Sequence, residues 1–177
     1  MSRCAVGGLS RMWVATLIAS LGVLAACDDG SSVGKDGLTR EDVVDFLNAQ
    51  IEASEELDVE QLSEYMAESV YMRGTATFDG AGIAPEVTEC VSREECVGVL
   101  ERELAAVSDY EVSVSDVEVS VAPDRRSATV RYTQHESGVI LGTRFEAEAA
   151  ATDEYEVEGR DLVITRSEAD AEVSLEL

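Results

Sequence analysis

The segment Ser92–Val114, SREECVGVLERELAAVSDYEVSV, decides the fold because its hydrophobic period changes half-way along. Ser92 and Glu95 have the spacing of a capping box, which marks the start of a helix. The next apolar residues are three or four positions apart, as on one stripe of a helix: Val97, Leu100, Leu104 and Val107. From Asp109 the period is two, with Tyr110, Val112 and Val114 on one face. The segment therefore predicts a helix that lies on a sheet and leads directly into a strand.

The strand predicted from Asp109 contains an irregularity. The valines after Asp116 alternate with the opposite parity to those before Ser115; they are Val117, Val119 and Val121. A slip of one residue would turn every later side chain to the wrong face of the sheet. We therefore expect a β-bulge or a sharp bend near Ser115 and Asp116.

Three more strands are predicted downstream, separated by turns at Pro123-Asp124, Ser137-Gly138 and Glu158–Asp161. The alternating residues are Ala128, Val130, Tyr132 and Gln134, then Phe145, Ala147, Ala149 and Ala151, and last Leu162 and Ile164. The second row is mostly alanine, so it would let a helix approach the sheet closely.

The chain before Ser92 predicts two helices, a strand and a loop. Thr39 and Asp58 are the candidate helix caps. The apolar face of the first helix comprises Val43, Val44, Phe46, Leu47 and Ile51, and the second carries Leu62, Tyr65 and Met66. Val70–Phe78 is β-prone, and Gly80–Glu89, with Gly82 and Pro85, reads as a loop. Helices that lead into a meandering, mainly antiparallel sheet indicate an α+β domain.

The N-terminal region has the layout of a secretory signal. Arg3 and Arg11 are the only charges before Asp28, and an apolar run from Met12 to Ala26 follows them. This run is shorter than the about 20 residues that a spanning helix needs, so a permanent transmembrane anchor is disfavoured.

The last residues of the run, Leu24-Ala25-Ala26-Cys27, resemble the lipobox of bacterial lipoproteins. The resemblance implies that residues 1–26 are removed and that Cys27 is diacylated, which anchors the protein stably in a membrane. It also implies a bacterial cell-envelope location that faces the extracytoplasmic side. Residues 27–37 are then a polar, glycine-rich tether, and residues 38–177 have the usual length of one domain. The alternative is an ordinary signal peptide that contains a cysteine.

The charge of the mature chain excludes some partners. Removal of Arg3 and Arg11 takes the formal net charge from −24 to −26, and Lys35 is the sole lysine. Such a chain should repel nucleic acid and anionic lipid head groups. The acidic residues indicate a well-solvated surface, with an acidic binding face as the alternative, and the regular apolar periodicity argues against disorder.

Cys90 and Cys96 remain after Cys4 and Cys27 are assigned to the signal and the lipid. In a secreted chain, two such cysteines suggest a disulfide that fastens the loop to the helix start. Two free thiols or a redox pair are the alternatives, although a redox motif needs closer spacing. One histidine adds too few ligands for a metal site, and we predict neither a metal nor a cofactor.

The order of elements resembles the nuclear-transport-factor-2-like (NTF2-like) superfamily, which includes SnoaL-like proteins and ketosteroid isomerases. The resemblance rests on VVDFLNAQIEASEELDVEQLSEYMAESVYMRG, SREECVGVLERELAAVSDYEV, RSATVRYTQ and VEGRDLVITRSEA. It implies a cone whose curved sheet wraps a long helix, often around an apolar pocket, and dimers are common. The family hosts enzymes, ligand binders and interaction modules, so the fold does not choose the function.

Three residues of one strand are candidates for a site. Tyr132 and Gln134 share the parity of the apolar face and could line a pocket, although such a tyrosine is more often part of the core. His135, the only histidine, could act as a general base, but the simpler interpretation is a solvent-facing residue. Ketosteroid isomerases use a carboxylate base with tyrosine or acid hydrogen-bond donors inside the cone, and we assign none of those roles to a residue of this chain.

The leading hypothesis is a membrane-anchored, non-enzymatic lipoprotein that binds a small apolar ligand or another envelope protein, with a homodimer as one arrangement. The second is an enzyme that works on a hydrophobic substrate in the cone. The third is an accessory subunit with a filled core. A deep cavity with a buried carboxylate of raised pKa beside tyrosine or histidine would favour the enzyme. An apolar cavity without such a group would favour the binder, and a packed interior with an exposed apolar sheet face would favour the accessory subunit.

Overall fold

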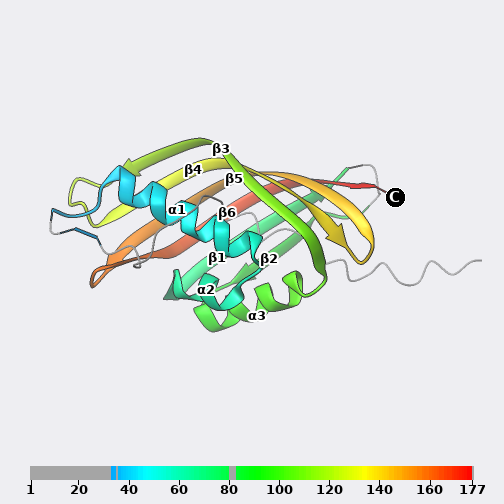
Figure 1. Cartoon of the computed structure of the whole chain (residues 1–177), viewed down its shortest axis with the longest axis horizontal. Helices are drawn as coiled ribbons and strands as arrows, with labels where there is room; N and C mark the ends of the chain where they lie inside the picture. Colours follow the sequence, from blue (N-terminus) through cyan, green and yellow to red (C-terminus); the bar gives the residue numbers. More distant parts are fainter. Residues whose placement is uncertain (1–32, 35, 80–82, 177) are drawn as a thin grey trace, which may run out of the picture.

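The computed structural model describes residues 33–34, 36–79 and 83–176. In chain order the elements are α1 (Arg40–Glu55), α2 (Val59–Glu64), β1 (Met66–Phe78), β2 (Glu86–Cys90), α3 (Arg93–Leu104), β3 (Val107–Val121), β4 (Ser127–Ile140), β5 (Thr143–Glu158) and β6 (Asp161–Glu176). Figure 1 shows a curved sheet with the helices gathered on one side of it. The predicted α+β class is confirmed.

The three predicted helix starts are confirmed. Thr39 caps α1, and its hydroxyl and the Asp42 carboxylate satisfy each other's backbone amides as a capping box. The Asp58 carboxylate accepts from the Gln61 amide at the start of α2. Ser92 accepts from the Glu95 amide at the start of α3. Each cap satisfies an amide that the first turn of a helix leaves without an intrahelical partner.

The buried face of α3 differs from the predicted stripe. Cys96, Val99, Leu100, Glu103 and Leu104 face the core, whereas Val97 is partly exposed and Val107 already belongs to β3. The disulfide at Cys96 turns this side of the helix inward, and the residues three, four, seven and eight positions later share its face. The buried stripe of α3 therefore includes Leu100 and Leu104, as predicted, but neither Val97 nor Val107.

The sheet has the strand order β2-β1-β6-β5-β4-β3. All neighbours are antiparallel except β1 and β6, which run parallel. The strand predicted at Val70–Phe78 is confirmed and starts earlier, at Met66. The loop predicted over residues 80–89 is wrong for residues 86–89, which form edge strand β2; residues 80–82 lie outside the described residues. Only Thr88 and Cys90 of β2 are buried, so its sequence carries little apolar alternation.

The turn predicted at Ser137-Gly138 is also wrong. Strand β4 continues to Ile140, and the hairpin turns at Leu141-Gly142, where Gly142 has φ +86°. Gly138 instead pairs with Phe145 on β5, and a β-carbon on Gly138 would lie 3.0 Å from the Phe145 ring. This glycine therefore makes room for an aromatic ring rather than reversing the chain.

The bulge predicted in β3 is confirmed. The pairing of β3 with β4 shifts register between Ser115 and Glu118, and Asp116 has φ +54°. A bulge increases the local twist and bends the strand. Here it lets the long strand keep apolar residues toward the core on both sides of the irregularity while the sheet curves (Figure 1). The turn at Pro123-Asp124 and the hairpin at Gly159-Arg160 are confirmed as well.

Helix α1 packs on the inner face of the sheet. The Phe46 ring contacts Tyr155 of β5 edge-to-face, with ring centroids 5.2 Å apart, and contacts Tyr65 at 5.4 Å. The alanine row is buried as predicted, and cross-strand pairs join Ala149 to Ala171 and Ala151 to Ala169. These small side chains line the sheet face on which the core is built.

The end of the predicted tether lies against two hairpins. The Val33 amide donates to the Arg160 carbonyl at 2.8 Å, and the Leu38 amide donates to the Arg125 carbonyl at 2.9 Å. The Arg125 guanidinium donates in turn to the Asp36 carbonyl. The chain therefore enters the domain beside the β3–β4 and β5–β6 turns.

Candidate functional site

Tyr132 and Gln134 lie on the inner side of β4 and are buried. The structure surrounds them with polar residues that the sequence analysis did not select, chiefly Asp153, Tyr155 and Glu136. Charged groups are seldom fully buried without a partner. The contacts of the Asp153 and Glu136 carboxylates therefore determine which ligands or chemistry the interior could support.

Asp153, on β5, is the centre of the first group, the aspartate site. Its Oδ2 accepts hydrogen bonds from the hydroxyls of Tyr132 at 2.9 Å and Tyr155 at 3.1 Å. Burial raises the pKa of Asp153 to about 6, although hydrogen bonds from Ser167 and the two tyrosines oppose the rise. Burial, with the negative charge of Asp153, raises the pKa of both tyrosines well above the usual range. At neutral pH the group holds mostly a carboxylate with two neutral phenols as donors.

Glu136, on β4, is the centre of the second group. Its Oε1 accepts from the Gln134 amide at 2.8 Å. Burial raises the pKa of Glu136 to about 8, and the charge of Glu103 adds to the rise, whereas Tyr110 and Gln134 oppose it. Glu136 is therefore mostly protonated at neutral pH.

Several buried atoms around these carboxylates have unused hydrogen-bonding capacity. Among the described residues, Asp153 Oδ1, Glu136 Oε2, the Tyr110 hydroxyl and both polar atoms of the Gln50 amide make no hydrogen bond of normal geometry. Tyr110 and Glu136 still interact electrostatically. Each such atom costs about 1–3 kcal/mol of desolvation, so a cluster of them indicates a place built for water or a ligand.

The sequence did contain a signal for both carboxylates. Glu136 continues the alternation that carries Tyr132 and Gln134, and Asp153 and Tyr155 continue the row of Phe145 and the alanines. An acidic residue at an inward position of an apolar row is the pattern that would have identified them.

His135 lies on the outer face of the sheet, as its simpler interpretation predicts. Its Nδ1 is 3.4 Å from Glu148 Oε2, and its Nε2 is 3.3 Å from the Ser115 hydroxyl. The imidazole is half-exposed and shares no contact with the aspartate site. His135 therefore does not join Tyr132 and Gln134 in one site.

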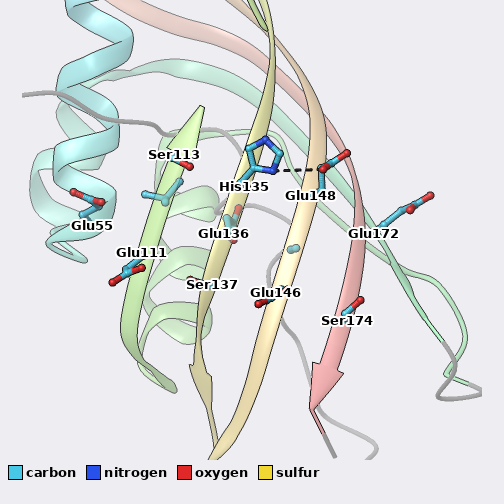
Figure 2. Close-up of a pocket in the computed structure, with 12 residues that line it drawn as sticks. Glu55, Glu111, Ser113, His135, Glu136, Ser137, Glu146, Glu148, Glu172 and Ser174 are labelled. Atoms are coloured by element: carbon cyan, nitrogen blue, oxygen red, sulfur yellow. Dashed lines mark ion pairs between the residues drawn. The ribbon is translucent and has the colours of Figure 1, made fainter. Parts of the chain in front are cut away.

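An open hollow of about 680 Å³ lies beside His135 at this end of the sheet and reaches Glu55 of α1 (Figure 2). Its exposed lining is mostly acidic and includes Glu111, Glu146, Glu148 and Glu172 beside His135. Glu136 borders the hollow, whereas Asp153 does not. The inner and outer faces of the sheet thus carry two separate polar sites.

The cysteine predictions divide between two parts of the chain. Cys90 and Cys96 form a disulfide, as predicted, and it joins the end of β2 to the first turn of α3. Cys27 lies outside the described residues, as does the whole predicted signal. No helix in the described part of the chain is long and apolar enough to cross a membrane.

No protein-family model matches the chain, and no curated protein matches it in sequence. Solved structures do match: an NTF2-like protein of unknown function from Pseudomonas putida (10% identity, TM-score 0.58) aligns over 76% of this chain and 89% of its own. An NTF2-like protein from Cytophaga hutchinsonii (13%, TM-score 0.57) aligns over 76% and 99%. The hexachlorocyclohexane dehydrochlorinase LinA-type3 from Novosphingobium barchaimii (11%, TM-score 0.56) aligns over 72% and 82%.

These likenesses show the fold of the protein. The chain has the NTF2-like fold, an α+β domain with a curved, mostly antiparallel six-stranded sheet, as its resemblance implied. At such low identities the likeness shows the fold alone. Because that fold is shared by proteins of unknown function and by a dehydrochlorinase, the function must be argued from the site.

Proposed function

We propose that this domain binds a small, mostly apolar molecule inside the cone, at the aspartate site. The proposal rests on the two carboxylate oxygens of Asp153. Oδ2 accepts hydrogen bonds from two tyrosines, whereas Oδ1 is buried without a hydrogen bond of normal geometry. The ligand would carry one hydroxyl that donates to Asp153 and accepts from the amide of Gln50, which also interacts with Tyr155. Small-molecule sites combine such a polar anchor with apolar walls.

The walls around the anchor favour an apolar ligand body. The Phe46 ring of α1 contacts Tyr155 edge-to-face, and small alanine side chains of β5 and β6 line the sheet face between Phe145 and Tyr155. Displacement of α1 from this face would open a space between an aromatic wall and a smooth alanine floor. The ligand would therefore be flat or compact, with its polar group at the Asp153 end.

Native mass spectrometry of the protein purified from its own host tests this proposal. We expect a retained small molecule, or a mass shift with added apolar alcohols, whose hydroxyl can donate to the Asp153 carboxylate, and a loss of at least tenfold in occupancy for Asp153→Asn or Tyr132→Phe. Tyr71→Phe is the matched control, since Tyr71 lies under Arg166 and away from the site. Equal occupancy in all three variants would refute the assignment of the site.

An enzyme that abstracts a proton is the second candidate, and the raised pKa of Asp153 favours it. A carboxyl group with a pKa of about 6 is ionised at neutral pH and is a stronger base than an exposed aspartate. A dehydrochlorinase has the same fold, which shows that this fold can house an enzyme but assigns no activity to this chain. The substrate would be a hydrophobic molecule with an acidic C–H group.

Hydrogen–deuterium exchange of carbon-bound protons distinguishes the two candidates. A panel of apolar ketones is incubated with the protein in D₂O and followed by NMR. An enzyme would accelerate exchange, and Asp153→Asn would remove about 10²-fold or more of that rate. A ligand that binds but never exchanges leaves the binding module as the function.

We also propose that the domain is displayed on the extracytoplasmic side of a bacterial membrane through a lipid on Cys27. The lipobox and the apolar run before it support this proposal. Metabolic labelling with a palmitate analogue should mark the wild type and not Cys27→Ala, with Cys4→Ala as the control that keeps the label. Label on the Cys27→Ala protein would contradict the anchor.

A further inference from the structure

Three side chains on the outer face of the sheet form a continuous chain of contacts. The Ser115 hydroxyl of β3 lies 3.3 Å from His135 Nε2 of β4, and His135 Nδ1 lies 3.4 Å from Glu148 Oε2 of β5. Figure 2 shows the last of these contacts across the two neighbouring strands. The two ring nitrogens of one histidine thus face a hydroxyl on one side and a carboxylate on the other.

We propose that Ser115, His135 and Glu148 form a nucleophilic site for acyl transfer from esters that carry a positive charge. In such a site the serine attacks, the histidine takes its proton and a carboxylate holds the histidine in the required tautomer. The arrangement is independent of the aspartate site, because the two lie on opposite faces of the sheet.

The strand register fixes the geometry of the site. His135 is paired directly with Glu148 on one side and with Ser113 on the other, so that Ser115 is the diagonal neighbour of the histidine. Diagonal neighbours on one sheet face are close enough for side chains to meet. Sheet pairing rather than flexible loops therefore positions all three groups.

The bulge in β3 lies directly beside the serine. The ladder passes from Ser115 to Glu118, and Asp116, with φ +54°, follows the serine immediately. Bulges often redirect a side chain next to an active site, and they place backbone amides outside the regular ladder, where an oxyanion could accept from them. The Ser115 hydroxyl also lies 3.4 Å from Asp116 Oδ2, which can accept its proton in a hydrogen bond. For the reaction to proceed, the hydroxyl must donate to His135 Nε2 instead when the substrate is bound.

The proposed reaction is balanced without a cofactor. Ser115 Oγ forms a bond to the ester carbonyl carbon and its proton moves to His135 Nε2. The tetrahedral intermediate then breaks the bond to the leaving oxygen, which takes the proton from the imidazolium. Water repeats the two steps on the acyl-serine and releases the acid, while Glu148 stabilises the imidazolium throughout.

The charge of the hollow determines the substrate class. Glu111, Glu146 and Glu172 are exposed around the histidine, and no Lys or Arg is among the residues that line the hollow. A surface of one sign concentrates ligands of the opposite sign and repels anions. The favoured substrates are therefore esters of amino alcohols or of other cationic groups.

A fluorophosphonate probe tests the nucleophile. Activated serines displace fluoride from phosphorus, so wild-type protein should be labelled at Ser115, as located by peptide mass spectrometry. We expect no label in Ser115→Ala and a rate at least about 10²-fold lower in His135→Gln. Ser113→Ala is the matched control, since Ser113 lies two residues earlier on β3, lines the hollow and is paired directly with His135. Failure to label Ser115, or equal rates in wild type and His135→Gln, would overturn the proposal.

Glu148 is a positioning residue, and a conservative replacement separates this role from a merely structural one. Glu148→Gln keeps the size but removes the charge, and should label more slowly than wild type. Glu148→Asp keeps the charge and should recover part of the rate. If Gln and Asp variants with unchanged circular dichroism label at the wild-type rate, the carboxylate has no role in the site.

The substrate class is tested with acetylthiocholine and its neutral isostere, 3,3-dimethylbutyl thioacetate. The cationic ester should be hydrolysed faster, and this advantage should fall in Glu172→Gln and as salt rises. Hydrolysis that survives in Ser115→Ala, or that favours the neutral ester, would contradict the proposed chemistry.

Discussion

Two buried carboxylates show how neighbouring donors set the charge state of an interior residue. Burial raises the pKa of both, from 3.8 to about 6 for Asp153 and from 4.5 to about 8 for Glu136. Ser167, Tyr132 and Tyr155 favour the ionised form of Asp153, whereas Glu136 is favoured in that form by Gln134 and by its interaction with Tyr110, and disfavoured by the charge of Glu103. The difference in donors and charges therefore leaves Asp153 mostly charged and Glu136 mostly neutral at pH 7.

Glu136→Gln should make stability less dependent on pH. The folded-state pKa of Glu136 lies above its unfolded value, so folding binds a proton, and its contribution is full below pH about 4.5 and lost as pH rises through about 8. The free energy of unfolding of the wild type should fall relative to the variant by roughly 5 kcal/mol over this range. Urea melts at several pH values measure it, with exposed Glu111→Gln as the control. Parallel curves for wild type and Glu136→Gln would contradict the assignment.

Tyr132→Phe should raise the pKa of Asp153 above about 6. The substitution removes one of the hydroxyl donors that favour the carboxylate and keeps the ring. We expect a loss of about 1 kcal/mol in stability at neutral pH as well. Carbon-13 NMR titration of the aspartate carboxyl measures the pKa, and Tyr71→Phe should leave it unchanged. A lower pKa in Tyr132→Phe would be inconsistent with the hydrogen bond.

At the scale of elements, β2 and α3 depend on each other. Strand β2 has only one sheet neighbour, β1, and the disulfide joins its last residue to the first turn of α3. Helix α3 also reaches β1, because Arg93 donates to the Met66 carbonyl and pairs with Glu68. The edge of the sheet is thus closed by a covalent bond as well as by packing.

Replacing both Cys90 and Cys96 with alanine should lower the free energy of unfolding by about 2 kcal/mol, the loop-closure entropy of so short a loop. Urea melts give the value. A reductant should destabilise the wild type by the same amount and leave the double variant unaffected. A reductant effect on the variant would show that the comparison measures something other than this bond.

The position of α1 depends on Phe46, whose ring joins Tyr65 and Tyr155. Phe46→Ala should cost about 3–5 kcal/mol, because it removes a fully buried ring and leaves a cavity against the sheet. Thermal and urea unfolding measure the loss. Val44→Ala, at a partly exposed position of the same helix, should cost much less, and equal losses would mean that the ring contacts do not hold the helix.

At the scale of the whole molecule, repulsion between the many acidic residues destabilises the folded state. The full chain has 37 acidic and 13 basic residues, and the acidic ones crowd the outer face of the sheet. Self-repulsion of this kind destabilises a folded protein and is screened by salt.

Raising NaCl from about 10 mM to about 0.5 M should therefore increase the melting temperature, because the Debye length falls to a few ångströms. Differential scanning calorimetry of the wild type measures the shift. A variant with Glu111, Glu146 and Glu172 changed to glutamine should melt higher at low salt and respond less to NaCl. A melting temperature independent of salt in both would show that the repulsion is not significant.

Local patterns in the sequence determined much of the fold. The caps at Thr39, Asp58 and Ser92, the bulge near Ser115 and the alternation in β4 and β5 all depend on residues within a few positions of one another. The two cysteines left in a chain expected to be secreted likewise predicted the bond between Cys90 and Cys96. Interactions between residues this close in the chain can be predicted without the tertiary structure.

Contacts between distant residues decided the rest. Gly138 resembles a turn residue in the sequence, and only the Phe145 ring opposite it makes it a strand residue. Asp153 meets Tyr132, and His135 meets Ser115 and Glu148, because β3, β4 and β5 pair side by side in the sheet. The raised pKa values of Asp153 and Glu136 likewise come from burial in the folded domain, which no pattern of neighbouring residues contains.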